Sequence, residues 1–387
     1  MNKIRRGNGW PTSKQEKLLK ACLLSGFEAH EAWIEWKNTT VIERIDPASY
    51  KLLPLVACNP DLRTLQDPLL TKCRWLHRQT LITNRLHFEK SMPLLSQLLK
   101  SGIDKIVLLK GIAMIVGYYK DFGARVIGDI DLLIPRSNAE TAVSILLSTG
   151  WRSLLPRLDV QCAEQLDRWH AVNFVHKEGM NIDLHWSLSL ESSAPLDSAV
   201  LQAAVPLAKN PLTLYLPNPG DLLLQTCIHG IKQCRVPLIR WVADALVLLK
   251  QSEKEIDWDR LVYLARQSHL CLSLSAAFDY LINRFNAPIP SSVVTDLDKN
   301  TPTSLEIREY WANARGYKNL AGWHRFCLKR GHLSAQSQLL HIHQYLQFSS
   351  LVKSPWQLPF FGLYWVFTRS IRYLFRKSLH LLKFRVN

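Results

Sequence analysis

Apolar positions recur at helical spacing through the first hundred residues of the chain. Behind Thr12 and Ser13, either of which can cap a helix, the apolar face is formed by Leu18, Leu19, Cys22 and Leu23. A later stretch over 74–99 keeps the same period, and we expect that helix to end at Gly102. The pattern predicts an all-helical N-terminal region over residues 1–100.

The hydrophobic period changes in the region that we assign to residues 101–190. Apolar or alternating runs predict strands over 105–109, 125–134, 151–155, 170–177 and 180–186, with a hairpin turn at Lys-Glu-Gly between the last two. Helices are predicted over 111–119 and 137–150, the second with Ser137 as N-cap, Glu140 completing a capping box and Gly150 as its end. Helices around a small mixed sheet indicate an α+β fold.

Helical patterning returns towards the C-terminus. Amphipathic segments at 220–230, 238–249, 257–267 and 270–285 predict a helical domain over residues 191–290, and the Pro-rich stretch 286–292 is a break. Residues 291–387 form a last region that is rich in aromatic and basic residues. The small mixed sheet is therefore flanked by helical regions on both sides in sequence.

Composition and charge place the protein among folded globular chains. The 387 residues are 47% hydrophobic and 21% charged, which is unlike a disordered protein. The formal net charge of +16 is uneven, because residues 310–387 hold 12 Lys and Arg and no Asp or Glu. Within it, the basic and aromatic segment from Trp356 to Arg385 either binds RNA or an anionic membrane face, or is a packed amphipathic helix pair with a solvated basic face.

Cysteine spacing and the N-terminus indicate the compartment. The eight cysteines include no C-x-x-C pair, which favours buried free thiols in a reducing compartment. The N-terminus lacks an apolar signal region, and no apolar run approaches the roughly 18 residues of a spanning helix. We expect a cytoplasmic protein that is peripheral at the membrane only if the basic region binds lipid.

The residues with the strongest chemical signal are two aspartates at the start of a buried strand. Asp129 and Asp131 are two apart in G-D-I-D-L-L-I-P, so on a strand both carboxylates project from one face. Adjacent carboxylates repel each other unless a cation lies between them. The pattern favours a divalent-metal site over a solvated strand end.

Three motifs in combination carry a resemblance to a known family. Lys110-Gly111, the segment Y-Y-K-D-F-G-A-R and then G-D-I-D-L-L-I-P resemble the uncharacterised nucleotidyltransferase family of the DNA polymerase beta-like superfamily, over roughly residues 75–250. The resemblance implies a nucleotidyltransferase core that binds an NTP, such as ATP, with Mg²⁺, for which Mn²⁺ can substitute. Asp129 and Asp131 are then metal ligands and catalytic residues.

The resemblance also assigns roles to residues outside the aspartate pair. Asp183, in N-I-D-L-H-W, becomes the third metal-binding and catalytic carboxylate, and Lys110 and Gly111 stand where the superfamily usually has Gly-Ser and become nucleotide-binding. Arg125 either clamps phosphate or pairs with Asp129.

Two further histidine-containing patterns leave alternatives open. His185 shares the face of Asp183 and is either an acceptor-side group or a structural histidine. The pattern H-G-x(9)-R-W-x-x-D contains His229, Arg240 and Asp244, and the resemblance makes it a recurrent helical feature behind the nucleotide pocket. The plainer account is a buried i,i+4 pair between Arg240 and Asp244.

These features support one leading hypothesis and two alternatives. The leading hypothesis is a Mg²⁺-dependent transfer of a nucleoside monophosphate from an NTP to an acceptor, which is a protein, RNA, a saccharide or a small molecule, with release of pyrophosphate. The first alternative is a D-x-D glycosyltransferase that uses a nucleotide sugar. The second is a non-catalytic nucleotide-fold module that docks on RNA or membrane.

Overall fold

A computed structural model describes residues 9–155, 166, 169–188, 194–208, 211–231, 236 and 238–315. All of these residues belong to one compact unit, which spans residues 1–329. The predicted basic and aromatic segment from Trp356 to Arg385 lies outside the described residues, so its RNA or membrane contact stays a prediction.

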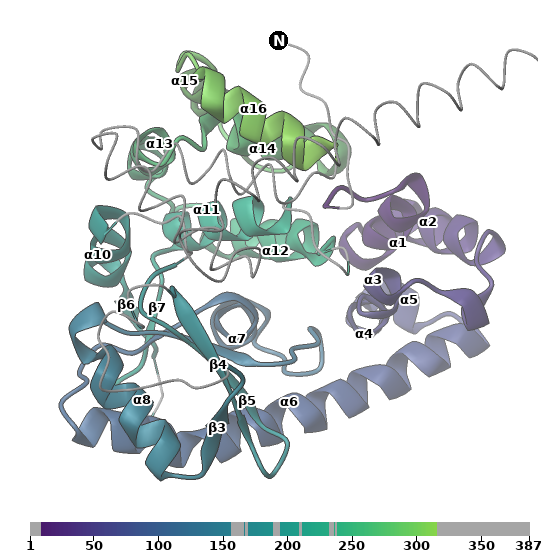
Figure 1. Ribbon diagram of the computed structural model, residues 1–387. Coiled ribbons are helices and arrows are strands. Elements are labelled where there is room, and N and C mark those ends of the chain that lie inside the picture. The colour runs from purple at the N-terminus through teal and green to yellow at the C-terminus, as the bar shows by residue number, and fades with distance from the viewer. Residues whose placement is uncertain are drawn as a thin grey trace, which may run out of the picture. The chain divides into compact units, whose positions relative to one another are not determined.

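The N-terminal region is helical, as predicted. Its elements are α1 (Ser13–Leu23), α2 (Gly26–Asn38), the 3₁₀ helix η1 (Ile42–Arg44), three short helices, α3 (Pro47–Tyr50), α4 (Leu53–Val56) and α5 (Pro60–Arg63), and the 33-residue α6 (Pro68–Lys100). Thr12 and Gln15 form the capping box of α1. Asp67 caps α6, which runs from these small helices to the sheet (Figure 1).

Seven strands form a mixed sheet in the order β3-β4-β5-β2-β1-β7-β6. Their bounds are β1 Val107–Leu108, β2 Ile130–Leu133, β3 Trp151–Ser153, β4 Ala171–His176, β5 Asn181–His185, β6 Val205–Pro206 and β7 Tyr215–Leu216. The central strand β2 is antiparallel to β1 and parallel to β5, while β4 and β5 form the predicted hairpin. The expected α+β fold is therefore confirmed.

The two faces of the sheet are covered differently. Ile130, Leu132 and Ile182 belong to the main hydrophobic core, which continues into the surrounding helices. The opposite face carries a small apolar cluster around Leu133 and Val200. Because side chains alternate along a strand, Asp131 in β2 points to the same side as Leu133 and away from the main core.

The helices next to the sheet begin and end differently from the prediction in two places. The predicted helix over 111–119 is α7 (Lys110–Met114) followed by a π-helical turn, η2 (Ile115–Tyr119). The predicted cap at Ser137 is wrong: a 3₁₀ turn, η3 (Arg136–Asn138), leads into α8 (Ala139–Ser148) at the N-cap Asn138, whose side chain makes no capping bond. Ser137 is the central residue of the 3₁₀ turn, so it does not occupy the N-cap position of α8.

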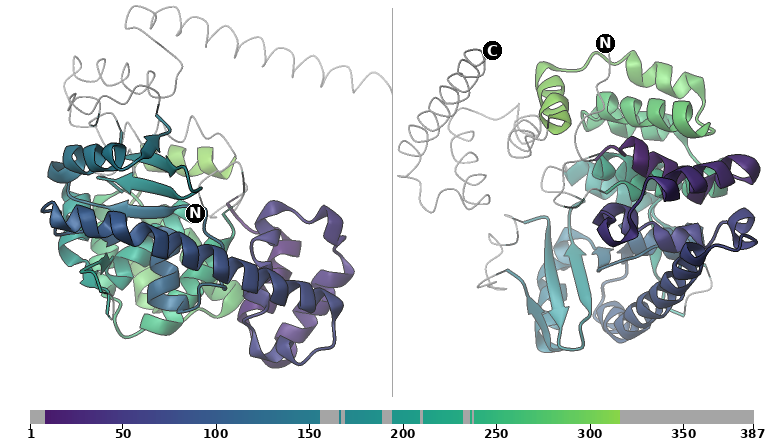
Figure 2. Two further views of the ribbon diagram at one scale, coloured as in Figure 1. Left: turned by 90° about the horizontal axis from the view of Figure 1, so that it is seen from below. Right: turned by 90° about the vertical axis from the view of Figure 1, so that its right-hand side faces the viewer.

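The C-terminal half of the described chain is helical. Its elements are α10 (Ala194–Ala203), α11 (Pro219–Gly230), α12 (Arg240–Ser252), α13 (Trp258–Gln267), α14 (Cys271–Phe285), α15 (Ser291–Asp298) and α16 (Ser304–Ala314). Trp10 packs edge-on against Trp241 and Tyr280, so the start of the chain rests on α12 and α14. Figure 2 shows the N-terminal helices beside this helical half in a second view.

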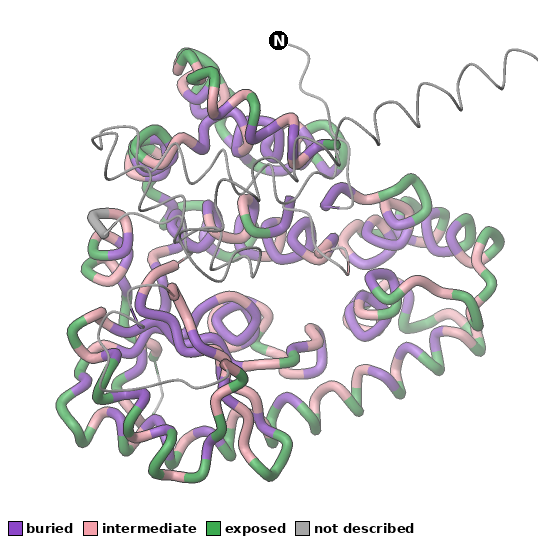
Figure 3. The backbone as a smooth tube through the Cα atoms, viewed as in Figure 1, coloured by how far each residue is buried: buried purple, intermediate pink, exposed green. Residues whose placement is uncertain are grey.

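Burial follows these layers. The sheet strands β1 and β2 and the inner faces of α11, α12 and α14 are buried, while α6 exposes one side along much of its length (Figure 3). Among the described residues, no helix is both long enough and apolar enough to cross a membrane.

Candidate functional site

Two of the three predicted carboxylates lie directly opposite each other. Asp131 and Asp183 are register partners on the parallel strands β2 and β5. Their neighbours, Ile130, Leu132, Ile182 and Leu184, are fully buried in the main core. The alternation that buries these apolar side chains therefore turns both aspartates to the other face of the sheet.

Lys110 reaches this pair from the first residue of α7. Its Nζ lies 2.5 Å from Asp131 Oδ1 and 3.7 Å from Asp183 Oδ2. Burial alone would lower the pKa of Lys110, but the two carboxylates raise it overall, so the ammonium charge is held. Lys110 has a φ of 48°, a left-handed conformation that costs a non-glycine residue energy and is found at functional sites.

His185 completes the group two residues after Asp183. Its Nε2 lies 3.1 Å from Asp131 Oδ1 and 3.0 Å from Asp183 Oδ2. Burial and the Lys110 charge would lower the pKa of His185, whereas the hydrogen bonds to the two carboxylates raise it. Its Nδ1 is buried without a hydrogen-bond partner. His185 therefore acts on the site through Nε2.

Asp129 stands at the margin of this group. It lies one residue before β2, is partly exposed, and is not among the residues whose ligating atoms converge, which are Asp131, Asp183 and His185. Burial and the negative charge of Asp131 raise the pKa of Asp129 to about 6. Asp129 thus interacts with the site through the charge of Asp131, and its role as a metal ligand stays a prediction.

The carboxylate partner of Arg125 is Asp244 in α12. Arg125 donates from Nε and Nη2 to the two oxygens of Asp244, both at 2.8 Å, and Tyr119 donates to Oδ1 at 3.0 Å. Arg240 donates instead to the carbonyl of Val126. The expectation that Arg240 pairs with Asp244, and the alternative that Arg125 pairs with Asp129, are therefore wrong, because the loop before β2 carries Arg125 across to α12.

The absence of a side chain at Gly111 leaves space for the guanidinium of Arg125. A Cβ on Gly111 would lie 2.3 Å from Arg125 Nη1 and 2.6 Å from Ile127, closer than atoms approach. Gly230 has the same function between helices, since a Cβ there would lie 2.1 Å from Trp241. These contacts account for the glycine, arginine, tryptophan and aspartate of the H-G-x(9)-R-W-x-x-D motif. Gly230 lets Trp241 of α12 pack against α11, and Arg240 and Asp244 of α12 bind the loop before β2.

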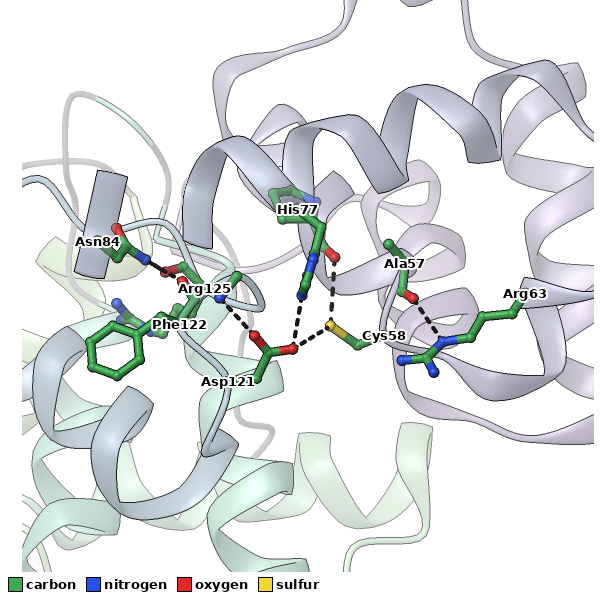
Figure 4. Close-up of polar contacts among 10 residues, drawn as sticks. Ala57, Cys58, Arg63, His77, Asn84, Asp121, Phe122 and Arg125 are labelled. Atoms are coloured by element: carbon green, nitrogen blue, oxygen red, sulfur yellow. Dashed lines mark hydrogen bonds and ion pairs between the residues drawn. The ribbon is translucent and has the colours of Figure 1, made fainter. Parts of the chain in front are cut away.

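Asn84, which no sequence motif singled out, holds the same loop from the other side. Its amide donates to the carbonyls of Phe122 and Arg125, both at 2.7 Å, and it is fully buried in α6 (Figure 4). A buried Asn needs hydrogen-bond partners, which the loop supplies, but no sequence signal marks Asn84, because its burial follows from the packing of the loop. Asn84 and Asp244 together fix the loop that leads to Asp131.

The donor atoms at the two strands fit a hard divalent cation. Two carboxylates in register supply the oxygen ligands that Mg²⁺ and Mn²⁺ prefer. Burial alone would raise the pKa of Asp131, but Lys110 and His185 hold it well below its usual range, so its carboxylate is ionised and ready to ligate. Asp131, Asp183 and, as an alternative donor, His185 are the residues that would hold such an ion.

A small mixed sheet with acidic side chains on two adjacent strands and a lysine at the first strand–helix turn has the architecture of a nucleotidyltransferase fold. The family model for uncharacterised nucleotidyltransferases matches residues 48–286, more than half of the chain. The chain belongs to this family, and the resemblance found over residues 75–250 is confirmed. Membership supports a general function in nucleotidyl transfer. No protein in a search of curated proteins matches the chain.

Proposed function

We propose that the protein transfers a nucleoside monophosphate from an NTP to an acceptor, releases pyrophosphate, and uses Mg²⁺, or Mn²⁺ in its place, held by Asp131 and Asp183 with Asp129 beside them. The observation that carries this proposal is the register pairing of Asp131 with Asp183, with Lys110 against both. When bound, the ion neutralises the triphosphate charge and orients it for in-line attack.

The residues of the chain supply the rest of the chemistry. Lys110 is a charged ammonium beside the carboxylates, and 23% of its side chain is exposed, so it is placed to bind phosphate oxygens once a triphosphate enters. Gly111 contributes by letting Arg125 pack against the turn. Arg125 donates to both oxygens of Asp244, which favours a role in positioning the loop. To contact nucleotide directly, its guanidinium would have to bind a phosphate and Asp244 at the same time.

Asp183 and His185 are the residues that we expect to face the acceptor. Asp183 is less buried than Asp131, with 21% of its side chain exposed against 6%. It is therefore the carboxylate that an incoming hydroxyl can reach and that can accept its proton. His185 Nε2 bonds both carboxylates and keeps them oriented as the acceptor binds.

The experiment is a labelling screen. Each α-³²P-labelled NTP is incubated with Mg²⁺, cell extract and the full-length protein, and transfer of label to macromolecules or metabolites is measured. We expect label with wild type and none with Asp131→Asn. Asp104→Asn, an exposed aspartate near β1, is the matched control and should label like wild type. Equal labelling by Asp131→Asn would overturn the proposal.

Calorimetric titration separates this activity from sugar transfer. Mg-NTP should bind, whereas nucleotide sugars should bind more weakly because the family and the lysine at the first turn point to a triphosphate. Tighter binding of a nucleotide sugar would move the assignment to a glycosyltransferase. The acceptor class follows from the labelled product.

A further inference from the structure

A second group of ligating side chains lies among the helices and shares no residue with the carboxylate site. Cys58 follows α4, His77 lies in α6, and Asp121 lies in the loop after η2 (Figure 4). Their Sγ, imidazole nitrogen and carboxylate oxygen all lie within 4.8 Å of one another. Three elements that are distant in sequence therefore present a sulfur, a nitrogen and an oxygen donor to one point.

The contacts within this group converge on a single oxygen. His77 Nε2 lies 2.8 Å from Asp121 Oδ2, and Cys58 Sγ lies 3.7 Å from the same atom. The other oxygen, Oδ1, accepts from the backbone amide of Gly123 at 2.8 Å. That bond fixes the carboxylate so that Oδ2 faces the cysteine and the histidine.

Gly123 is also what makes space for the histidine. A Cβ at this position would lie 2.4 Å from His77 Nε2 and 2.5 Å from the next ring carbon. Any other residue at position 123 would push the imidazole off Asp121. The loop is thus shaped around the ring of His77 as well as around its own aspartate.

Cys58 differs from the other described cysteines. Cys22, Cys73, Cys227 and Cys271 are buried, whereas Cys58 is partly exposed. Burial and the nearby Asp121 charge raise the pKa of the Cys58 thiol to about 12. At neutral pH it is a protonated thiol and a poor nucleophile, so a role as a reactive cysteine is disfavoured.

We propose that Cys58, His77 and Asp121 bind a zinc ion, with water as the fourth ligand. A thiolate, an imidazole and a carboxylate are a zinc donor set, and Mg²⁺ does not select sulfur. Tetrahedral zinc bonds place such donors about 3.3–3.6 Å apart. Cys58 and Asp121 are already at 3.7 Å, so binding would require the 2.8 Å His77–Asp121 contact to open and Cys58 Sγ, which lies within 4.8 Å of the imidazole nitrogen, to settle at bonding distance from the same ion.

The site is open enough for the ion to enter. The side chains of His77 and Asp121 are 21% and 34% exposed, so hydrated zinc can reach them and retain one water. On binding, the Cys58 sulfur exchanges its proton for the metal and releases that proton to solvent. The Nε2 proton that His77 uses in its hydrogen bond to Asp121 is taken up by solvent, while Nδ1 keeps or regains a proton, and two metal bonds replace that hydrogen bond.

Zinc at this position would tie two regions together. Cys58 and His77 belong to the N-terminal helices, and Asp121 begins the loop that continues through Arg125 to Asp129 and β2. The bound ion would therefore stiffen that loop and raise the temperature of unfolding.

Optical titration with Co²⁺ tests the proposal. The metal-free, full-length protein is titrated with Co²⁺ and then with Zn²⁺ as competitor. We expect one Co²⁺ per chain to give a thiolate-to-cobalt charge-transfer band in the near ultraviolet, which Zn²⁺ displaces and a large excess of Mg²⁺ leaves unchanged; Co²⁺ at the carboxylate site contributes no thiolate band. Cys58→Ser should lose the band, and Asp121→Asn should weaken Co²⁺ binding at least tenfold.

The controls separate this site from folding and from the carboxylate site. Cys271→Ser removes a buried thiol outside the group and should keep the band. Asp131→Asn should also keep it, so a failed transferase proposal would leave this one standing. Metal-free Cys58→Ser should melt at the temperature of metal-free wild type, and Zn²⁺ should raise the melting temperature of wild type but not that of Cys58→Ser. If wild type shows no thiolate band, or Cys58→Ser retains it, the zinc site is refuted.

Discussion

The two ligand groups of this protein are built in contrasting ways. Asp131, Asp183 and His185 come from adjacent strands, and their spacing is set by backbone hydrogen bonds. Cys58, His77 and Asp121 come from a helix end, a helix interior and a loop, and their spacing depends on how those elements pack. The first arrangement is as rigid as the sheet, whereas the second is only as rigid as the contacts around Gly123 and Asn84.

The difference in chemistry matches the difference in construction. The strand group is rich in oxygen, has two of its three side chains buried, and is surrounded by compensating charges, as the proposed phosphate chemistry with a hard cation would require. The helical group has mixed donors and is more exposed, as suits a borderline metal that holds elements in place. Ligand side chains can therefore be brought together by strand register or by helix packing. We expect mutations in the strand group and in the helical group to affect different properties of the protein.

The largest expected effect is the loss of activity at the strand group. Asp183→Asn removes one of the two opposed carboxylates, and we expect nucleotidyl transfer to fall about a thousandfold, which corresponds to about 4 kcal/mol of transition-state stabilisation. The measurement is the initial rate of label transfer at saturating Mg-NTP. Asp104→Asn serves as the exposed control, and a fall of less than tenfold in Asp183→Asn would show that the register pair is not the reactive centre.

The second effect is on stability and concerns the anchor of the loop between the groups. Asp244→Asn leaves the guanidinium of Arg125, whose side chain is 13% exposed, without its carboxylate. We expect a loss of about 3–5 kcal/mol in the free energy of unfolding, measured by urea denaturation.

An exposed ion pair provides the comparison for that measurement. Asp296→Asn breaks the contact with Lys299, in which both side chains are exposed to solvent, and should leave the free energy of unfolding nearly unchanged. Similar losses in the two variants would mean that Arg125 is not held by a buried charge pair.

A third, smaller effect probes the packing of the helical group. Gly123→Ala places a methyl group against His77, and we expect a loss of about 1–3 kcal/mol in the free energy of unfolding together with weaker Co²⁺ binding. Gly128→Ala is the matched control, since a Cβ there meets no atom within 4 Å. If both glycine variants are equally stable, the helical group is more adaptable than its contacts suggest.

The smallest expected effect concerns the cap of α6, the helix that carries His77 and Asn84. Burial would raise the pKa of Asp67, but hydrogen bonds from Lys37, Trp33 and the Leu69 amide lower it below its ordinary value of 3.8. A lowered pKa in the folded state means stability that is fully present above pH 3.8 and is lost as the pH falls through the folded-state pKa.

The change Asp67→Ala measures that contribution. At neutral pH the variant should be destabilised by about 1–2 kcal/mol, and the charge-dependent part of the difference from wild type should shrink as the pH falls below about 4. Glu35→Ala, which removes an exposed partner of Lys17, is the control. A difference that stays constant with pH would assign the effect to helix capping alone, without the charge.

Much of the strand group was predictable from local pattern. The alternation in G-D-I-D-L-L-I-P and N-I-D-L-H-W places Asp131, Asp183 and His185 on one face of their strands, and burial of the intervening apolar residues follows from the same period. The helix over α6, its end near Gly102 and the β4–β5 hairpin are likewise consequences of local sequence. The cap at Ser137 was not, because a 3₁₀ turn competes with the capping geometry over the same few residues.

Pairing between distant segments could not be predicted in the same way. Arg125 could have met Asp129, Asp244 or a phosphate, and only the docking of α12, permitted by Gly230, brings Asp244 to it. Asn84 looks like an ordinary polar residue of a long helix until the loop at Phe122 lies against it.

The amino-acid sequence alone determined the elements, the faces that they bury and the presence of a carboxylate motif, because these depend on periodicities that each segment carries within itself. Tertiary structure decided which charges meet: the register of β2 with β5 opposes Asp131 to Asp183, and the packing of α6 against the loop joins His77 to Asp121. The physical reason is that a side-chain contact of a few ångströms depends on strand register and helix docking, which arise from the whole core and not from any one segment.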